Sequence, residues 1–110
     1  MGFCLFGCGG DDSVSENLSA IEFKKEMSGS DTIVIDVRTA SEIANGKLAP
    51  DALELDFYAP DFREKLDALD RDKKYLIYCR SGNRSGQALK IMREMGFKNA
   101  RHLEGGEISF

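Results

Sequence analysis

The stretch Cys79-Arg80-Ser81-Gly82-Asn83-Arg84 stands between an apolar run and a helical pattern. The preceding run, Tyr75-Leu76-Ile77-Tyr78, is short, apolar and aromatic, which is typical of a buried β-strand. Residues 85–95 carry apolar side chains every three to four positions and are followed by Gly96, which predicts a helix that ends there. The sequence therefore predicts a cysteine at a strand end, in a tight loop that leads into the N-terminus of a helix.

This position favours a reactive thiol. The first turn of a helix has N–H groups without partners and a partial positive charge, so it stabilises an anion beside it. Arg80 and Arg84 add positive charge next to Cys79, and Gly82 permits backbone conformations in which successive N–H groups point into the loop. A buried, inert cysteine at the end of a core strand is the alternative. Two arginines, a glycine and small polar residues favour an anion site over a core position.

Three segments resemble landmarks of the single-domain rhodanese-like sulfurtransferases. Residues 79–85, with the strand before them, are similar to the active-site loop of that family. Ile35-Asp36-Val37-Arg38 resembles its Asp-x-Arg segment, and Glu104-Gly105-Gly106, followed by an apolar residue and then Phe110, resembles its closing glycine pair and aromatic. The landmarks occur in the family's order, and the resemblance runs from about Leu18 to the C-terminus.

The resemblance implies a small, mainly parallel sheet flanked by helices, with Cys79 as the catalytic residue. It also places Asp36 and Arg38 near the active site as supporting residues. Their residue types alone favour a structural ion pair or cap over direct catalysis. Residues 46–52 depart from the usual Gly-His-Ile-Pro-Gly-Ala of the family, because Lys47 replaces the histidine, Asp51 replaces a glycine and one residue is added. The departure leaves the conformation of this turn open and does not touch the cysteine loop.

Along the rest of the chain, helical patterns alternate with short apolar runs. Ser19 with Glu22, and Thr39 with Glu42, have the spacing of a capping box and predict two helix starts. The expected helices cover residues 19–27, 39–45, 62–69 and 85–95, and the expected strands cover residues 32–37, 53–55, 75–78 and 100–103. This order predicts an α/β fold with a mainly parallel sheet, whose sites lie beyond the carboxyl ends of the strands. His102 is expected to be a surface strand residue, since nothing in the sequence places it near Cys79.

Composition describes one domain without a disulfide framework. The chain has 110 residues, a net charge of −4 and a pI near 5.0, which argue against broad nucleic-acid binding. No stretch is long enough to span a bilayer. The odd count of cysteines (Cys4, Cys8 and Cys79) favours a reducing compartment, so a cytoplasmic location is expected. Together with His102, the two N-terminal cysteines match no common zinc spacing.

Residues 1–17 are predicted to be a mobile tail, and residues 18–110 the folded domain. Leu5-Phe6-Gly7-Cys8 resembles a bacterial lipobox, but the segment before it has no Lys or Arg and is short. A cell-envelope lipoprotein anchored through Cys8 would need a true start further upstream, so an untethered tail is favoured. A third hypothesis makes Cys4 or Cys8 a relay that receives sulfur from Cys79.

Two kinds of enzyme hold a cysteine in an anion cradle. A cysteine phosphatase needs five residues between the cysteine and its arginine, whereas only four separate Cys79 from Arg84, which favours sulfur transfer. In the expected mechanism, the Cys79 thiolate takes a sulfur from a donor such as thiosulfate or a persulfide and passes it to a thiophilic acceptor such as a thiol or cyanide. A protein acceptor is also open. Neither cofactor nor metal is required.

The loop residues Arg80 to Ser85 are expected to bind the anionic donor and the persulfide. Their N–H groups stabilise the outer sulfur, and the two arginines steer anions toward it. Ser81 and Ser85 either hydrogen-bond the persulfide or cap the helix. The alternative to an enzyme is a rhodanese-like binding or regulatory module without turnover, which the intact cysteine loop does not favour.

Overall fold

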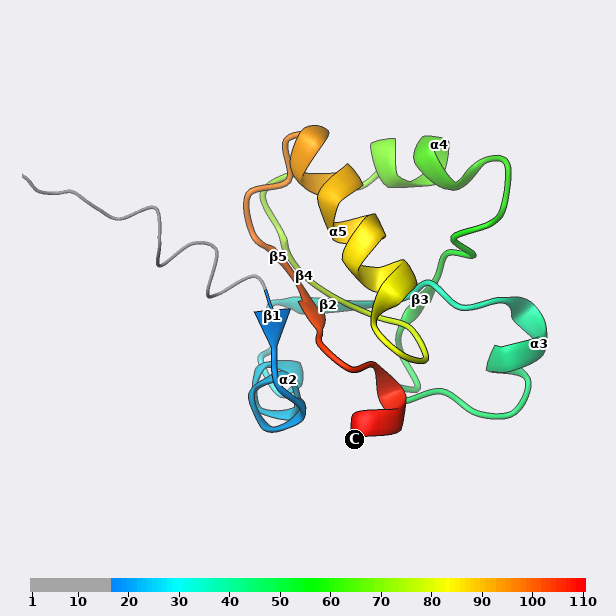
Figure 1. Cartoon of the computed structure of the whole chain (residues 1–110). Helices are drawn as coiled ribbons and strands as arrows, with labels where there is room; N and C mark the ends of the chain where they lie inside the picture. The colour runs from blue at the N-terminus through cyan, green and yellow to red at the C-terminus, as the bar shows by residue number, and fades with distance from the viewer. Residues whose placement is uncertain (1–16) are drawn as a thin grey trace, which may run out of the picture.

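A computed structural model describes residues 17–110, which form a five-stranded, all-parallel sheet with the strand order β1-β5-β4-β2-β3 (Figure 1). The predicted α/β class is confirmed. The strands are β1 (Asn17–Leu18), β2 (Thr32–Asp36), β3 (Leu53–Glu54), β4 (Lys74–Tyr78) and β5 (Ala100–Leu103). The helices are α2 (Ala20–Met27), α3 (Ala40–Ile43), α4 (Phe62–Asp67) and α5 (Asn83–Glu94), and the chain ends with the 3-10 helix η1 (Glu107–Ser109).

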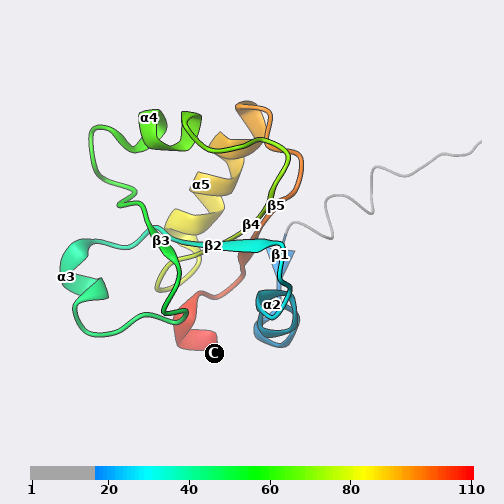
Figure 2. The same cartoon turned by 180° about the vertical axis from the view of Figure 1, so that it is seen from behind.

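The helices cover both faces of the sheet. Figures 1 and 2 show α4 and α5 together on one face and α2 on the other, on the same side as the C-terminal segment. Alternation along β4 divides its side chains between these layers, because successive side chains of a strand point to opposite faces. Ile77 joins the cluster under α4 and α5, and Leu76 and Tyr78 join the cluster with Phe23 of α2. Cys79 continues this alternation on the α5 side.

Local signals in the sequence account for two of the helix starts. The Ser19 hydroxyl accepts the N–H of Glu22 at 3.2 Å, and the Glu22 carboxylate accepts the N–H of Ser19 at 2.9 Å. The Thr39 hydroxyl and the Glu42 carboxylate form the same reciprocal arrangement at the start of α3. Both predicted capping boxes are confirmed, and each satisfies N–H groups that a helix start would otherwise leave unpaired.

Three elements differ clearly from the expectations. Helix α5 begins at Asn83, two residues before the predicted start, because Gly82 adopts a left-handed φ of 99° and turns the chain into the helix at once. The sequence predicts Asn17 as the last residue of the tail, but Asn17 begins β1 and pairs in parallel with His102. The short helix η1 was also not predicted. Strands of two residues and single turns of 3-10 helix carry too few side chains for a periodic pattern to reveal them.

Within residues 17–110, none of the helices has the length and apolar character needed to cross a membrane. The tail hypotheses on Cys4, on Cys8 and on the lipobox-like segment fall outside the described residues.

Candidate active site

Cys79 lies at the carboxyl end of β4, which runs between β5 and β2 near the middle of the sheet. The register of β4 with β2 pairs Tyr78 with Asp36, so the ends of these two strands meet at one edge of the sheet. The Cys79 side chain is buried, with 0% of its surface exposed, and belongs to the apolar cluster beneath α5. Its position is the one that parallel sheets commonly use for functional groups.

The loop after Cys79 wraps around the sulfur atom. The N–H groups of Gly82 and Ser85 donate to Cys79 Sγ at 3.1 and 3.3 Å. The Ser85 hydroxyl lies 3.4 Å from the same sulfur and 3.3 Å from the carbonyl oxygen of Gly82, to which it can donate. Because Gly82 is left-handed and Ser85 lies in the first turn of α5, these donors converge on one point. The geometry is that of a small anion cradle with Sγ at its centre.

These contacts change the pKa of the Cys79 thiol. Burial is the largest single influence and raises the pKa, because it disfavours the thiolate. Hydrogen bonds from the Ser85 hydroxyl and from the N–H groups of Ser85, Gly82 and Ser81 act in the opposite direction. Together they outweigh burial, and the pKa lies below its ordinary value of 9.0. The loop therefore favours the form of the cysteine that acts as a nucleophile.

The two arginines of the loop have different surroundings. Arg84 binds the Glu42 carboxylate through both of its terminal nitrogens, at 2.7 and 2.9 Å, and its guanidinium lies 5.8 Å from the centre of the Tyr58 ring. This pairing raises the pKa of Arg84 and joins the start of α5 to α3. Arg80 is exposed and borders a hollow of about 120 Å³ that Glu42 and Glu107 also line. Of these two arginines, Arg80 is therefore the one whose charge is more accessible from solvent.

The other polar residues of the loop point away from the sulfur or present only their backbone. Ser81 and Asn83 are exposed, and the Asn83 side chain accepts a hydrogen bond from Gln87 at 2.7 Å. Ser85, by contrast, is fully buried against Cys79. Of the two serines that the sequence could not separate, Ser85 has its hydroxyl at the sulfur.

Asp36 and Arg38 form a buried ion pair next to the loop. The Arg38 guanidinium contacts the Asp36 carboxylate through Nε at 3.0 Å and Nη2 at 2.8 Å, and both side chains are almost completely buried. Arg38 also donates to Glu107 and to the carbonyl oxygen of Gly46, at 2.8 and 2.7 Å. It thus ties the end of β2 to the C-terminal segment and to the turn after α3. The contacts of this pair are with neighbouring elements, which fits a structural role.

Tyr78 connects this ion pair to the core. Its hydroxyl donates to Asp36 at 2.6 Å and accepts the N–H of Leu48 at 3.0 Å. Burial and the adjacent Asp36 carboxylate raise the pKa of Tyr78 to about 12. The turn that departs from the family pattern is held by this contact and by Lys47, whose ammonium pairs with Glu54 at 2.9 Å.

His102 is a site residue that the sequence did not reveal. It was expected on the surface, but it is only 7% exposed, and its Nδ1 lies 3.0 Å from Ser85 Oγ. The expectation was wrong because both faces of an all-parallel sheet are covered, so an inner strand such as β5 has no solvent side. Its alternation with Ala100, on the α5 side of the sheet, is the signal that could have placed it.

The segment with the glycine pair, Gly105-Gly106, packs against the backbone of the cysteine loop. The N–H groups of Glu107 and Ile108 donate to the carbonyl oxygens of Cys79 and Arg80, at 2.9 and 3.2 Å. Gly106 approaches the loop so closely that a Cβ added there would overlap the Arg80 carbonyl and lie 2.5 Å from the Ser81 nitrogen. Only a residue without a side chain permits this contact.

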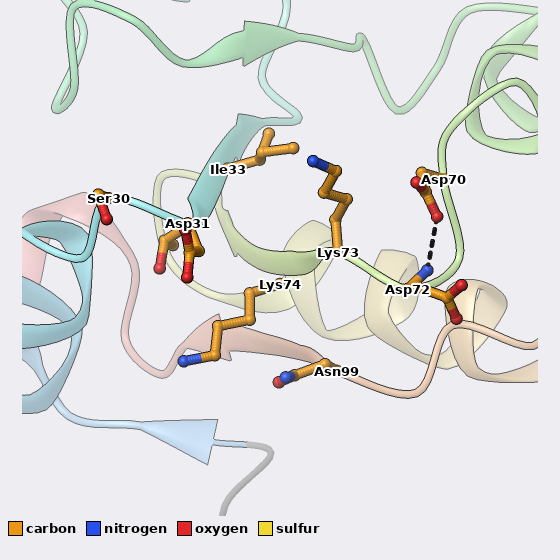
Figure 3. Close-up of a pocket in the computed structure, with 9 residues that line it drawn as sticks. Ser30, Asp31, Ile33, Asp70, Asp72, Lys73, Lys74 and Asn99 are labelled. Carbon is orange, nitrogen blue, oxygen red and sulfur yellow. Dashed lines mark hydrogen bonds between the residues drawn. The ribbon is translucent and has the colours of Figure 1, made fainter.

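The surface has other hollows, with linings of a different kind. One of about 540 Å³ lies at the opposite ends of β2 and β4, where its lining mixes carboxylates and ammonium groups from Asp31, Asp70, Lys73 and Lys74 (Figure 3). Among residues 17–110, no three His, Cys, Asp or Glu side chains come together in a way that could hold a metal ion.

The rhodanese-like domain family matches residues 19–107. The chain belongs to this family. It is 34% identical over 99 residues to a protein of Allochromatium vinosum named sulfurtransferase, and the match covers 90% of this chain and 82% of that protein. The solved structure of a rhodanese-related protein from Thermoplasma volcanium is 28% identical, with a TM-score of 0.71 and coverage of 83% and 85% of the two chains.

Rhodanese-like domains also occur in longer proteins with another named reaction. A tRNA uridine(34) hydroxylase of Citrobacter koseri is 35% identical over 103 residues, a match that covers 88% of this chain and 29% of that protein. The family assignment made from the sequence is confirmed. Its members differ in reaction, so the chemistry of this chain has to be argued from its own site.

Proposed function

We propose that this rhodanese-like domain is a sulfurtransferase that moves a sulfane sulfur from a donor to a thiophilic acceptor through a persulfide on Cys79. The observation that carries the proposal is the convergence of the Gly82 and Ser85 N–H groups, with the Ser85 hydroxyl, on Cys79 Sγ. Donors fixed in this way stabilise a thiolate, and they remain in place to stabilise a charged sulfur attached to it. The named activity of the Allochromatium vinosum relative supports the same chemistry.

The reaction proceeds by two displacements at sulfur. The Cys79 thiolate attacks the outer sulfur of thiosulfate, a new S–S bond forms, and sulfite leaves with the electron pair of the old one. An acceptor thiolate or cyanide then attacks the outer sulfur of the persulfide, and Cys79 leaves as the thiolate. No net oxidant or reductant is consumed. A persulfide donor follows the same course, with a thiolate as the leaving group.

The surroundings of the cradle suit a small anionic donor. Arg80 is exposed beside the loop, where its charge attracts anions, whereas the charge of Arg84 is balanced by Glu42. Cys79 itself is buried, so a compact donor that can enter the loop is favoured over a bulky one. The acceptor is of the thiol or cyanide class, and a protein thiol belongs to that class.

The test is mass spectrometry of the full chain after incubation with thiosulfate, beside a Cys79→Ser variant. The expected result is a gain of one sulfur that cyanide or a thiol removes and that the variant lacks. Trypsin cleaves after Lys74 and Arg80, so the peptide 75–80 reports Cys79 separately from Cys4 and Cys8. If neither thiosulfate nor polysulfide gives an adduct on this peptide, sulfur transfer is refuted and a binding module without turnover takes its place.

A further inference from the structure

A line of hydrogen bonds connects Cys79 to the first strand of the sheet. Ser85 Oγ lies 3.4 Å from Cys79 Sγ and 3.0 Å from His102 Nδ1. The other ring nitrogen, His102 Nε2, lies 2.8 Å from Asn17 Oδ1. The four residues come from the end of β4, from α5, from β5 and from β1. A single hydroxyl group therefore separates the thiol from an imidazole.

Asn17, at the end of this line of hydrogen bonds, determines the direction in which the groups donate. Asn17 presents its amide oxygen, which can only accept, so the hydrogen of a neutral His102 ring resides on Nε2. The lone pair on Nδ1 then faces Ser85. The single hydroxyl hydrogen of Ser85 can be donated to Nδ1 at 3.0 Å in place of the Gly82 carbonyl oxygen at 3.3 Å, while the hydroxyl oxygen accepts from the thiol. Each group donates to the next, from Cys79 to Asn17. Such an arrangement can move a proton away from sulfur without any change in the positions of the heavy atoms.

We propose that His102 is a positioning residue that accepts the Cys79 proton through Ser85, with Asn17 holding the imidazole in the required tautomer. The S–H bond breaks as an O–H bond forms on Ser85, and the original hydroxyl hydrogen of Ser85 forms the new N–H bond on Nδ1. The products are a thiolate and an imidazolium, and no electron is gained or lost. The Ser85 hydroxyl then donates to the thiolate. The inference rests on the proposed role of Cys79 as a nucleophile.

The packing around His102 keeps the ring in this line. The side chain is almost fully buried, and its ring lies against α5 at Gly86, where an added Cβ would be 3.4 Å from Cε1. Ile77, its register partner on β4, is apolar. A buried imidazolium is costly unless it is paired. Here the thiolate, reached through one hydroxyl, and the Asn17 amide oxygen supply the partners.

Several charged groups lie on the elements that surround this line of hydrogen bonds. Arg101 neighbours His102 on β5 but faces the opposite layer, where it binds Glu26 of α2 at 3.0 Å. Arginines keep their charge throughout the range in which an imidazole titrates. Helix α5 also carries Arg84 with its partner Glu42, and Arg93, which donates to the Ala100 carbonyl. The remaining charged groups on α5, β4 and the loop are exposed, and they are Lys90, Glu94, Lys74 and Arg80.

The experiment measures how fast iodoacetamide alkylates Cys79 in the full chain, from about pH 5 to about pH 9, which spans the imidazole and thiol titrations. The tryptic peptide 75–80 again separates Cys79 from Cys4 and Cys8. Because alkylation needs only the thiolate, the readout does not require sulfur transfer. A chain that forms no persulfide from either thiosulfate or polysulfide would refute the proposed function, and its alkylation profile would still test the role of His102.

His102→Asn is the decisive variant, since its amide oxygen can still accept from Ser85 but takes no proton in this range. We expect its alkylation rate below neutral pH to fall about tenfold, which corresponds to a rise of one unit in the thiol pKa, and to meet the rate of the unchanged chain at high pH. Arg101→Gln is the matched control, because it removes a charge from the same strand on the opposite face. Its profile should superimpose on that of the unchanged chain.

Substitutions at Asn17 separate positioning from a general structural effect. Asn17→Asp places a carboxylate on Nε2, which stabilises the imidazolium and should speed alkylation at low pH. Asn17→Leu removes the acceptor and should slow it. A His102→Asn profile identical to that of the unchanged chain, or shifts of the same sign in both Asn17 variants, would overturn the proposal. If circular dichroism shows that His102→Asn does not fold, the Asn17 pair decides the question.

Discussion

Replacement of Gly106 by alanine should damage the cysteine loop more than it damages the fold. Gly106 adopts φ 69° and ψ −171°, a region that essentially only glycine occupies, and its backbone lies directly under the loop. An added Cβ would lie 2.5 Å from the Ser81 nitrogen and overlap the Arg80 carbonyl. Both of these neighbours are backbone atoms, so they cannot rotate out of the way as a flexible side chain could. The loop itself must move.

The size of the effect follows from these distances. Real Cβ atoms essentially never come closer than 3.0 Å to such neighbours, so Ser81 must shift by about 0.5 Å and Arg80 by more. A misplacement of about 1 Å in a reacting group costs on the order of 100-fold in rate, so a loss of roughly 10- to 100-fold in persulfide formation is expected. The unfavourable backbone conformation adds about 1–3 kcal/mol of destabilisation.

The assay compares the rates of persulfide formation and of alkylation at Cys79 with the thermal unfolding midpoint of each variant. Gly105→Ala is the matched control, because Gly105 also has a positive φ, of 86°, but its added Cβ would meet the Ser109 side chain, at 3.1 Å, and not the loop. Both variants should lose stability, and only Gly106→Ala should lose reactivity beyond that. Equal rates at Cys79 in the two variants would refute the claim that the glycine contact positions the sulfur.

The other predictions concern two ion pairs, Arg84 with Glu42 and Arg38 with Asp36. The Glu42 pKa is lowered from 4.5 to about 2, and the largest cause is the hydrogen bonding from Arg84. The stability that this pair contributes should therefore be complete above about pH 4.5 and be lost as the pH falls toward 2. In urea titrations of a Glu42→Gln variant, the free energy of unfolding should no longer show this loss at acid pH. If it falls with pH as much as in the unchanged chain, the assignment is contradicted. Arg38→Leu should lower the free energy of unfolding by about 3–5 kcal/mol, because it leaves a buried Asp36 carboxylate without its counter-charge. Replacing both residues of that pair by leucine should cost less than the single change, and urea unfolding that shows the reverse would count against a charge-based explanation.

Local sequence signals predicted the elements that local physics determines. The capping boxes at Ser19 and Thr39 need only residues three positions apart, and both are present in the structure. The β-branched run before Asp36 became β2, and the break at Gly96 ended α5. The cysteine at a strand end, beside a helix N-terminus, followed from the same kind of reasoning. Its hydrogen-bond donors could be anticipated as backbone N–H groups of the loop.

The parts that escaped prediction depend on contacts between distant segments. An arginine of the loop can face either solvent or a carboxylate, and the position of α3 decides which. In the structure, α3 places Glu42 against Arg84. The surroundings of His102 depend in the same way on the pairing of β1 with β5 and on the crossover that lays α5 over them. Neither arrangement leaves a periodic trace in the sequence. The two-sided burial of a parallel sheet would still have argued against a surface position for His102.

Two segments of the chain form the cradle around Cys79, the cysteine loop with the start of α5 and the C-terminal segment. The N–H groups that face the sulfur belong to the loop and α5, but the carbonyl groups on the outside of the loop are held by Glu107 and Ile108. Arg38, bound to Glu107, fixes that support to β2. Hydrogen-bond donors stabilise developing charge most effectively when they need no reorganisation. In the proposed reaction, the C-terminal segment would therefore contribute by keeping the loop in place before the sulfur donor binds. Gly106, which packs under the loop, therefore helps to shape the cradle, although it does not touch the sulfur.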